Sequence, residues 1–130
     1  MILLIPLFAA IMPFFLWPIE TLLPYPYLIE EAAKLALIIP LLKLKDRTQA
    51  IKLAVIAGVL FAFSETVLYM FNIFLVGRTD TLIIRLLLTI PLHTLTTVII
   101  LASGLKDKKY LPLGLAAAIV IHFLFNNLAS

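Results

Sequence analysis

Five apolar stretches, separated by short polar connections, occupy most of this 130-residue chain. They run approximately over residues 2–23, 29–42, 50–76, 81–105 and 111–129. A helix needs about 20 apolar residues to cross the hydrocarbon core of a bilayer. Charged residues make up only 13% of the chain, and a soluble fold with so few would expose large apolar patches. The sequence therefore predicts an all-α, polytopic membrane helix bundle of about five transmembrane helices, with a single membrane domain over residues 1–130.

The chain contains no cysteine, which excludes disulfide frameworks, thiolate metal sites and cysteine nucleophiles. Its formal net charge of +3 does not indicate nucleic-acid binding, because most basic residues lie at the ends of apolar stretches, where they anchor helices to lipid head groups. We therefore expect contact with membrane lipid and none with nucleic acid, while the oligomeric state stays open. The first stretch lacks the basic region of a secretory signal, so we expect it to be retained as a span.

Seven of the ten Lys and Arg residues lie in or beside two of the four connections. Cytoplasmic connections are enriched in Lys and Arg, which predicts a cytoplasmic N-terminus and an external C-terminus. The opposite connections hold Glu20, Arg78 and Asp80. The seven basic residues are Lys43, Lys45, Arg47, Lys52, Lys106, Lys108 and Lys109.

A second group of polar and ionisable residues lies inside or beside the apolar stretches. A charged side chain at the centre of a membrane helix costs about 2.5–3.5 kcal/mol on insertion scales. Such residues usually face the bundle interior and mark a site. The group consists of Glu30, Glu31, Lys34, Glu65, Arg85, His93, His122 and Asn126.

Four of these residues share one predicted depth. Glu30, Glu65, His93 and His122 each lie thirteen residues from a lysine at a basic connection. At 1.5 Å per residue, each lies roughly 20 Å above the inner interface, about two thirds of the way across a ~30 Å core. Asn126 follows His122 by four residues and therefore shares its helix face. The spacing predicts one polar layer in the outer half of the bilayer.

Four short motifs, in order along separate apolar stretches, resemble those of the PrsW-type intramembrane proteases. The resemblance covers about residues 28–127, nearly the whole chain. The motifs are EExxK at Glu30, Glu31 and Lys34, FxxxE at Phe61 and Glu65, a third motif at Arg85, Pro91, His93 and Gly104, and HxxxN at His122 and Asn126.

This resemblance implies a membrane-embedded endopeptidase in a prokaryotic plasma membrane. The family is related to the CAAX prenyl endopeptidases and bacteriocin-processing enzymes, and more distantly to the Aph scaffold subunit of gamma-secretase. PrsW-type enzymes are implicated in cleaving membrane-anchored anti-sigma factors, so the implied partner is a membrane-anchored protein or peptide substrate. The chain is shorter than usual family members, which carry additional spans.

Peptide hydrolysis requires a base to activate water, a group to stabilise the oxyanion and an acid for the leaving amine. In one glutamate-dependent version, Glu30 is the general base, and Glu31 and Lys34 tune it. His122 and Asn126 then stabilise the oxyanion. This version needs no cofactor.

In the glutamate-dependent version, His93 or Glu65 positions the water.

In a second, metal-dependent version, Glu65, His93 and His122 form a candidate zinc site of the His₂Glu type, and Glu30 deprotonates a water in the open position. The residues alone do not choose between the two versions.

Arg85 is a supporting residue in either version. It can pair with Glu20, Glu30 or Glu31, or bind a substrate carbonyl or a lipid phosphate. The alternative function is a non-catalytic membrane scaffold or immunity-type protein of the same superfamily, in which the polar group only holds the helices together.

Overall fold

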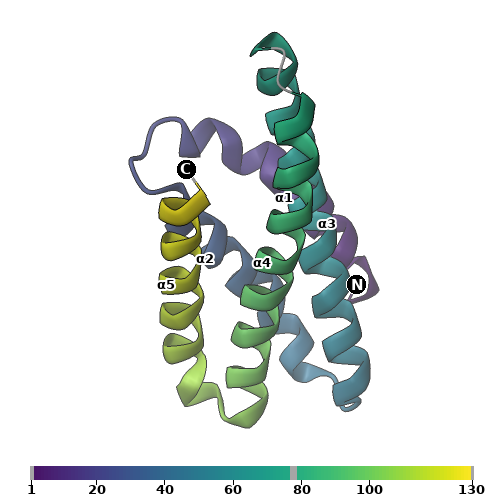
Figure 1. Cartoon of the computed structure of the whole chain (residues 1–130). Helices are drawn as coiled ribbons and strands as arrows, with labels where there is room; N and C mark the ends of the chain where they lie inside the picture. Colours follow the sequence, from purple (N-terminus) through teal and green to yellow (C-terminus); the bar gives the residue numbers. More distant parts are fainter. Residues whose placement is uncertain (1, 77–78, 130) are drawn as a thin grey trace.

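The computed structural model describes residues 2–76 and 79–129, with side chains for residues 2–70 and 83–128, so Arg78 and the Asp80 side chain lie outside the described part. This part is almost entirely helical and contains no strand (Figure 1). The predicted all-α class is therefore confirmed. Its α-helices are α1 (Ile5–Glu20), α2 (Pro26–Ile38), α3 (Arg47–Val76), α4 (Thr79–Lys106) and α5 (Leu111–Ala129), with 3₁₀ segments at Ile2–Leu4, Ile39–Lys43 and Lys108–Tyr110.

Four helical segments of the described residues are long and apolar enough to cross a membrane: Ile2–Glu20, Arg47–Met70, Ile83–Lys106 and Lys108–Leu128. Many large apolar side chains on these segments are exposed, as expected for helices that face lipid rather than water. The protein is therefore a multi-pass integral membrane protein. The remaining helix, α2, is shorter and carries most of the charge found inside the bundle.

The helices form two antiparallel hairpins, α3 with α4 and α4 with α5 (Figure 1). Helix α1 runs obliquely across the bundle and packs mainly against α3. Helix α2 contacts α1, α4 and α5. Because it has neighbours on several sides, its polar side chains are shielded from lipid.

Prolines set both limits of α2. Pro26 is the first residue of the helix, a position where the missing backbone N–H costs no hydrogen bond. Pro40 has no N–H to donate to the carbonyl four residues earlier, and the chain changes to a 3₁₀ segment at Ile39. The result is a helix of 13 residues that places its charges inside the bundle.

Aspartates cap the helices at both basic connections. Asp46 Oδ1 accepts hydrogen bonds from the backbone N–H groups of Thr48 (2.9 Å) and Gln49 (3.2 Å) at the start of α3. Asp107 Oδ1 accepts one from Lys109 N (3.0 Å) just before α5. Figure 1 shows both connections at the same end of the bundle, and all seven basic side chains named above are exposed there.

Helices α3 and α4 approach closely at Gly58. A Cβ atom at this position would lie 2.7 Å from Thr94 Cα and 3.0 Å from the His93 carbonyl oxygen, closer than ordinary packing contacts. Small residues at helix contacts are typical of membrane bundles, because they let backbones pack against each other. The absence of a side chain at Gly58 therefore sets the position of the α4 backbone beside His93.

We predict that Gly58→Val lowers the thermal stability of the detergent-solubilised protein. Overpacking of a close contact costs about 1–3 kcal/mol, because the two backbones must separate. The measurement is thermal unfolding followed by circular dichroism. Ala117→Val, at an exposed position on α5, is the control and should change stability little; equal losses in the two variants would contradict the role given to Gly58.

Candidate active site

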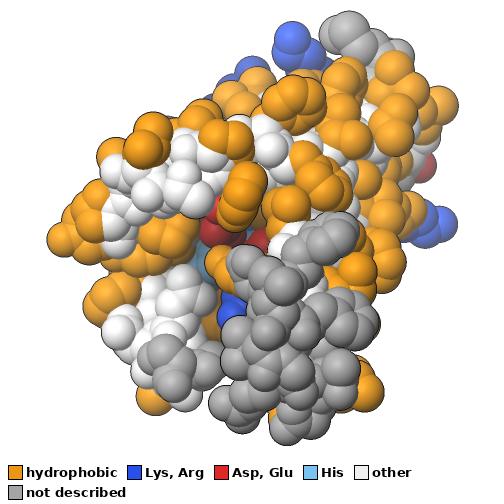
Figure 2. Space-filling view, turned by 90° about the horizontal axis from the view of Figure 1, so that it is seen from above, with side chains coloured by type: hydrophobic (Ala, Val, Ile, Leu, Met, Phe, Trp, Pro, Cys, Tyr) orange, Lys and Arg blue, Asp and Glu red, His pale blue; other side chains and the backbone are white. Residues whose placement is uncertain are grey.

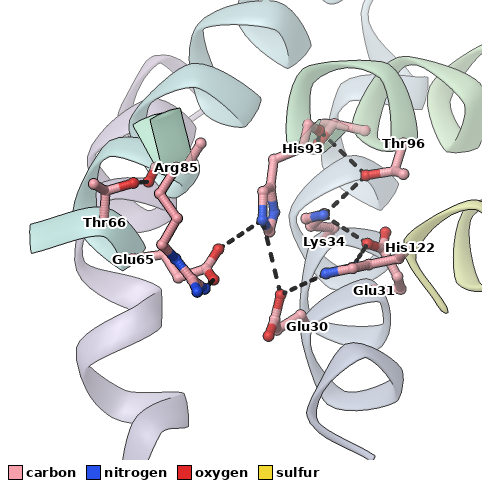
Figure 3. Close-up of polar contacts among 11 residues, drawn as sticks. Glu30, Glu31, Lys34, Glu65, Thr66, Arg85, His93, Thr96 and His122 are labelled. Carbon is pink, nitrogen blue, oxygen red and sulfur yellow. Dashed lines mark hydrogen bonds and ion pairs between the residues drawn. The ribbon is translucent and has the colours of Figure 1, made fainter. Parts of the chain in front are cut away.

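The four residues of the predicted polar layer meet in the bundle interior, each from a different helix (Figure 3). His93 Nε2 on α4 lies 2.6 Å from Glu65 Oε2 on α3 and 4.0 Å from Glu30 Oε2 on α2. His122 Nε2 on α5 lies 3.6 Å from the same Glu30 oxygen. These distances place the four residues in one layer of the bundle, as the lysine spacing predicts.

These side chains are almost fully buried. His93 is 0% exposed, His122 3% and Glu30 4%, and the Glu65 side chain is 12% exposed. Ionisable groups at such positions are expensive unless they are paired or bind a ligand. The burial therefore requires a compensating interaction for each group.

Glu31 and Lys34 form a second, adjoining group. Lys34 Nζ donates to Glu31 Oε1 at 2.7 Å and to Thr96 Oγ1 of α4 at 2.9 Å. Glu31 and Lys34 lie three residues apart on the same helix. The hydrogen bond from Lys34 to Thr96 ties α2 to α4.

Both histidines are held by neighbouring groups. The Nδ1 atom of His122 lies 2.7 Å from Glu31 Oε1, where an N–H donates to this carboxylate, and Nε2 lies on the side of Glu30. The ring of His93 stacks on Phe61 of α3, with centroids 5.2 Å apart, and its backbone carbonyl accepts a hydrogen bond from Thr97 Oγ1 (2.6 Å). The sequence identifies Phe61 only as the first residue of the FxxxE motif and does not show that its ring stacks on His93.

Several polar atoms at the centre of the layer lack hydrogen-bond partners among the residues whose side chains are described. They include Glu30 Oε2, Glu65 Oε2 and both ring nitrogens of His93. The close approach of His93 Nε2 to Glu65 Oε2 thus lacks the alignment of a hydrogen bond. Buried polar atoms are nearly always satisfied, so this group of atoms has the capacity to bind a ligand.

The arrangement fits a metal ion. Ligand atoms of Glu30, His93 and His122 all lie within 4.8 Å of one another. Zinc binds such atoms at 2.0–2.2 Å, which places tetrahedral ligands about 3.4 Å apart. A ligating histidine commonly donates its second ring N–H to a carboxylate, as His122 does to Glu31. The residue pattern predicts Glu65 beside the two histidines; in the structure Glu65 lies 2.6 Å from His93, and Glu30 lies near both histidines, at 4.0 Å from His93 and 3.6 Å from His122.

A cavity of about 270 Å³ adjoins this cluster. Figure 2 looks onto the end of the bundle away from the basic connections, and acidic and histidine side chains are visible in a hollow there. The cavity is lined by Pro26, Glu30, Glu65, Tyr69, Ile84, Arg85, Leu88, Thr89, His122, Phe125 and Asn126. The Glu/His cluster therefore borders a hollow at this end of the bundle.

Arg85 lies in the cavity wall next to Glu65. Its Nη2 atom is 3.9 Å from Glu65 Oε1, and its guanidinium carbon lies 3.8 Å from the centroid of the Tyr69 ring. The sequence predicts Glu20, Glu30 or Glu31 as the partner of Arg85, whereas the structure places Arg85 beside Glu65. Tyr69 follows Glu65 by four residues, so both lie on the helix face that meets Arg85. This spacing is the feature of the sequence that points to the contact.

Comparison with protein-family profiles matches residues 25–130 to a family described as "PrsW family intramembrane metalloprotease". This chain belongs to the PrsW family. The matched segment begins at the N-terminal end of α2 and includes every residue of the polar layer. This match confirms that the four motifs are those of the PrsW family, whose activity is intramembrane proteolysis. Neither the curated proteins nor the solved structures compared with the chain include a match.

We predict that Lys34→Met strongly destabilises this PrsW family member. Removing one partner of a buried ion pair costs about 3–5 kcal/mol, because the Glu31 carboxylate stays buried without its cation. Adding Glu31→Gln should recover part of the loss, since no isolated charge then remains. Thermal unfolding in detergent measures both.

The control is Lys109→Met, which removes an exposed ion pair to Asp107 (3.2 Å) and should change stability little. If Lys34→Met unfolds at the same temperature as this control, the Glu31–Lys34 pair does not hold the bundle together.

Proposed function

We propose that this protein is an intramembrane endopeptidase that hydrolyses peptide bonds of membrane-anchored proteins, with a divalent metal such as zinc held by Glu30, His93 and His122. The observation that carries the proposal is the convergence of ligand atoms of Glu30, His93 and His122 beside a cavity of about 270 Å³; of these atoms, Glu30 Oε2 and the ring nitrogens of His93 lack hydrogen-bond partners among the described side chains. Two histidines and a carboxylate are a frequent catalytic zinc set. Family membership supports the same reaction.

A zinc ion bound there would supply Lewis acidity and a hydroxide equivalent near neutral pH. Glu65 is the group that would accept the proton of the attacking water, because it lines the cavity and lies next to His93. It would then give this proton to the amine nitrogen as the C–N bond breaks, so that the products are a carboxylic acid and an amine. This assignment exchanges the roles that the sequence analysis gives to Glu30 and Glu65 in the metal-dependent version.

Two further side chains on the cavity wall suit the oxyanion that forms at the scissile carbonyl. Asn126 lies one helical turn beyond His122 and lines the cavity, where its amide N–H₂ can donate. The guanidinium of Arg85 borders the same space. Glu31 and Lys34 are positioning residues in this proposal, because they act through His122 and Thr96 rather than on the substrate.

We predict different outcomes when Glu30 and Glu65 are each replaced by glutamine. Glu30→Gln should lose most of its bound zinc and all measurable cleavage. Glu65→Gln should keep the zinc and lose about 10²–10⁴-fold in cleavage rate, the usual contribution of a general base. Zinc is measured by mass spectrometry of the purified protein. Cleavage is measured in proteoliposomes on a library of single-span reporter proteins with randomised residues next to a leucine-rich span.

Asp107→Asn, an exposed acid at the opposite end of the bundle, serves as the control and should match the unaltered protein in both assays. Cleavage without bound metal, abolished by Glu30→Gln, would favour the glutamate-dependent version. No cleavage of any reporter, together with loss of stability in both variants, would favour the non-catalytic scaffold.

The orientation in the membrane is a further part of the proposal. All seven basic side chains of the two inner connections are exposed at one end, and the cavity opens toward the other (Figures 1 and 2). The enrichment of cytoplasmic connections in Lys and Arg then gives a cytoplasmic N-terminus and a cavity on the external side of a prokaryotic plasma membrane.

Because the chain has no cysteine, single introduced cysteines test this orientation. We predict that Lys108→Cys in intact cells is protected from a membrane-impermeant maleimide, and that Leu22→Cys, in the exposed connection between α1 and α2, is labelled. Permeabilised cells, in which both should react, provide the control. Labelling of Lys108→Cys alone in intact cells would reverse the orientation.

A further inference from the structure

A second hollow, apolar and open to the side, lies between α4 and α5. It has a volume of about 440 Å³ and is lined by four side chains from Leu88 to Leu95 and four from Ile121 to Leu128. Every lining residue is apolar. The two helices lie side by side at the front of the bundle (Figure 1). We refer to this hollow as the α4–α5 groove.

The α4–α5 groove continues into the candidate active site. Leu88 and Phe125 line both the groove and the polar cavity. Along α4, the cavity residues Arg85 and Thr89 are followed by the groove residues Leu92 and Leu95. A chain that lies in the groove therefore reaches the Glu/His cluster without crossing another helix.

We infer that the α4–α5 groove binds the apolar membrane segment of the substrate polypeptide, in the part that adjoins the scissile bond. The inference rests on the proposed protease function. From Leu88 to Leu95 the helical rise is about 10 Å, enough for about three residues of extended chain. The groove holds this short apolar run, and the next residues enter the polar cavity, where the bond is cleaved.

The groove and the cavity together provide the two environments, apolar and aqueous, that proteolysis inside a membrane requires. The substrate arrives through lipid, whereas hydrolysis needs water. The groove is apolar along its whole length and ends at a cavity with Glu30, Glu65 and Arg85 in its wall. A substrate segment can thus exchange lipid for protein contacts on one side while the scissile bond becomes accessible to water on the other.

The first experiment locates the segment by crosslinking, in the inactive Glu30→Gln background. Leu124→Cys in the groove and Leu87→Cys outside it are each labelled with benzophenone maleimide in proteoliposomes. The probe is a biotinylated peptide with a twenty-residue span of leucine and alanine between lysines. Adducts with the probe are expected from Leu124→Cys, and these should disappear when Leu95→Trp fills the groove.

The second experiment measures cleavage with the catalytic residues intact. Leu95→Trp and Leu124→Trp should lower kcat/KM for the single-span reporter by about tenfold or more, since several buried apolar contacts are lost. Cleavage of a short peptide with the same cleavage sequence but no span should stay unchanged. Leu87→Trp is the matched control and should leave both rates unchanged. The Leu87 side chain is 66% exposed, against 51% for Leu95. Leu87 lies on the same helix as Leu95 but outside the groove.

The two experiments separate failure of this inference from failure of the proposed function. Equal probe adducts from Leu87→Cys and Leu124→Cys, adducts with lipid alone, or adducts between two copies of the chain would each overturn the inference. So would equal loss of reporter and short-peptide cleavage in the tryptophan variants. Absence of all cleavage by the unaltered protein would overturn the proposed function, and the crosslinking result would still report on the groove.

Discussion

The carboxylate of Glu31 organises the interior of this bundle. It is fully buried and receives Lys34 from its own helix and His122 from α5 through one oxygen, while Lys34 reaches on to Thr96 of α4. A charge in an apolar bundle is tolerated only where such partners converge. The short helix α2 must therefore lie among its neighbours, and the positions of α4 and α5 around it follow from this requirement.

The second constraint is a set of buried polar atoms that have no hydrogen-bond partners among the described side chains. Glu31 Oε1 is bonded to both Lys34 and His122, while Glu31 Oε2 has no partner among the described side chains. Glu30 Oε2 and both ring nitrogens of His93 also lack hydrogen-bond partners there. The bonded part of the cluster fixes the helices, and the atoms without partners beside it can bind a metal, water or substrate. The two groups thus divide structural and chemical roles over a few ångströms, which also explains why one helix carries two adjacent glutamates.

Much of the fold and part of the site can be predicted from the residues. Long apolar stretches predict α3, α4 and α5, because helix formation in a membrane is a local necessity. Equal spacing from lysines predicts that Glu30, Glu65, His93 and His122 share a depth. Spacing does not say which of them face one another, since it carries no information on helix rotation or neighbour order. For this reason the sequence does not show that Glu65 contacts His93 alone, whereas Glu30 lies near both histidines.

The amino-acid sequence alone determined that this chain lies in a membrane, that its polar residues share one layer, and that its motifs are those of the PrsW family, because hydrophobicity, helical rise and residue order are properties of the chain itself. Tertiary structure decided the pairs: Lys34 with Glu31, Arg85 with Glu65 and Tyr69, and His93 on Phe61. It also produced the cavity and the α4–α5 groove. These features depend on how helices approach, as at Gly58, and such approach distances result from packing between segments far apart in the sequence.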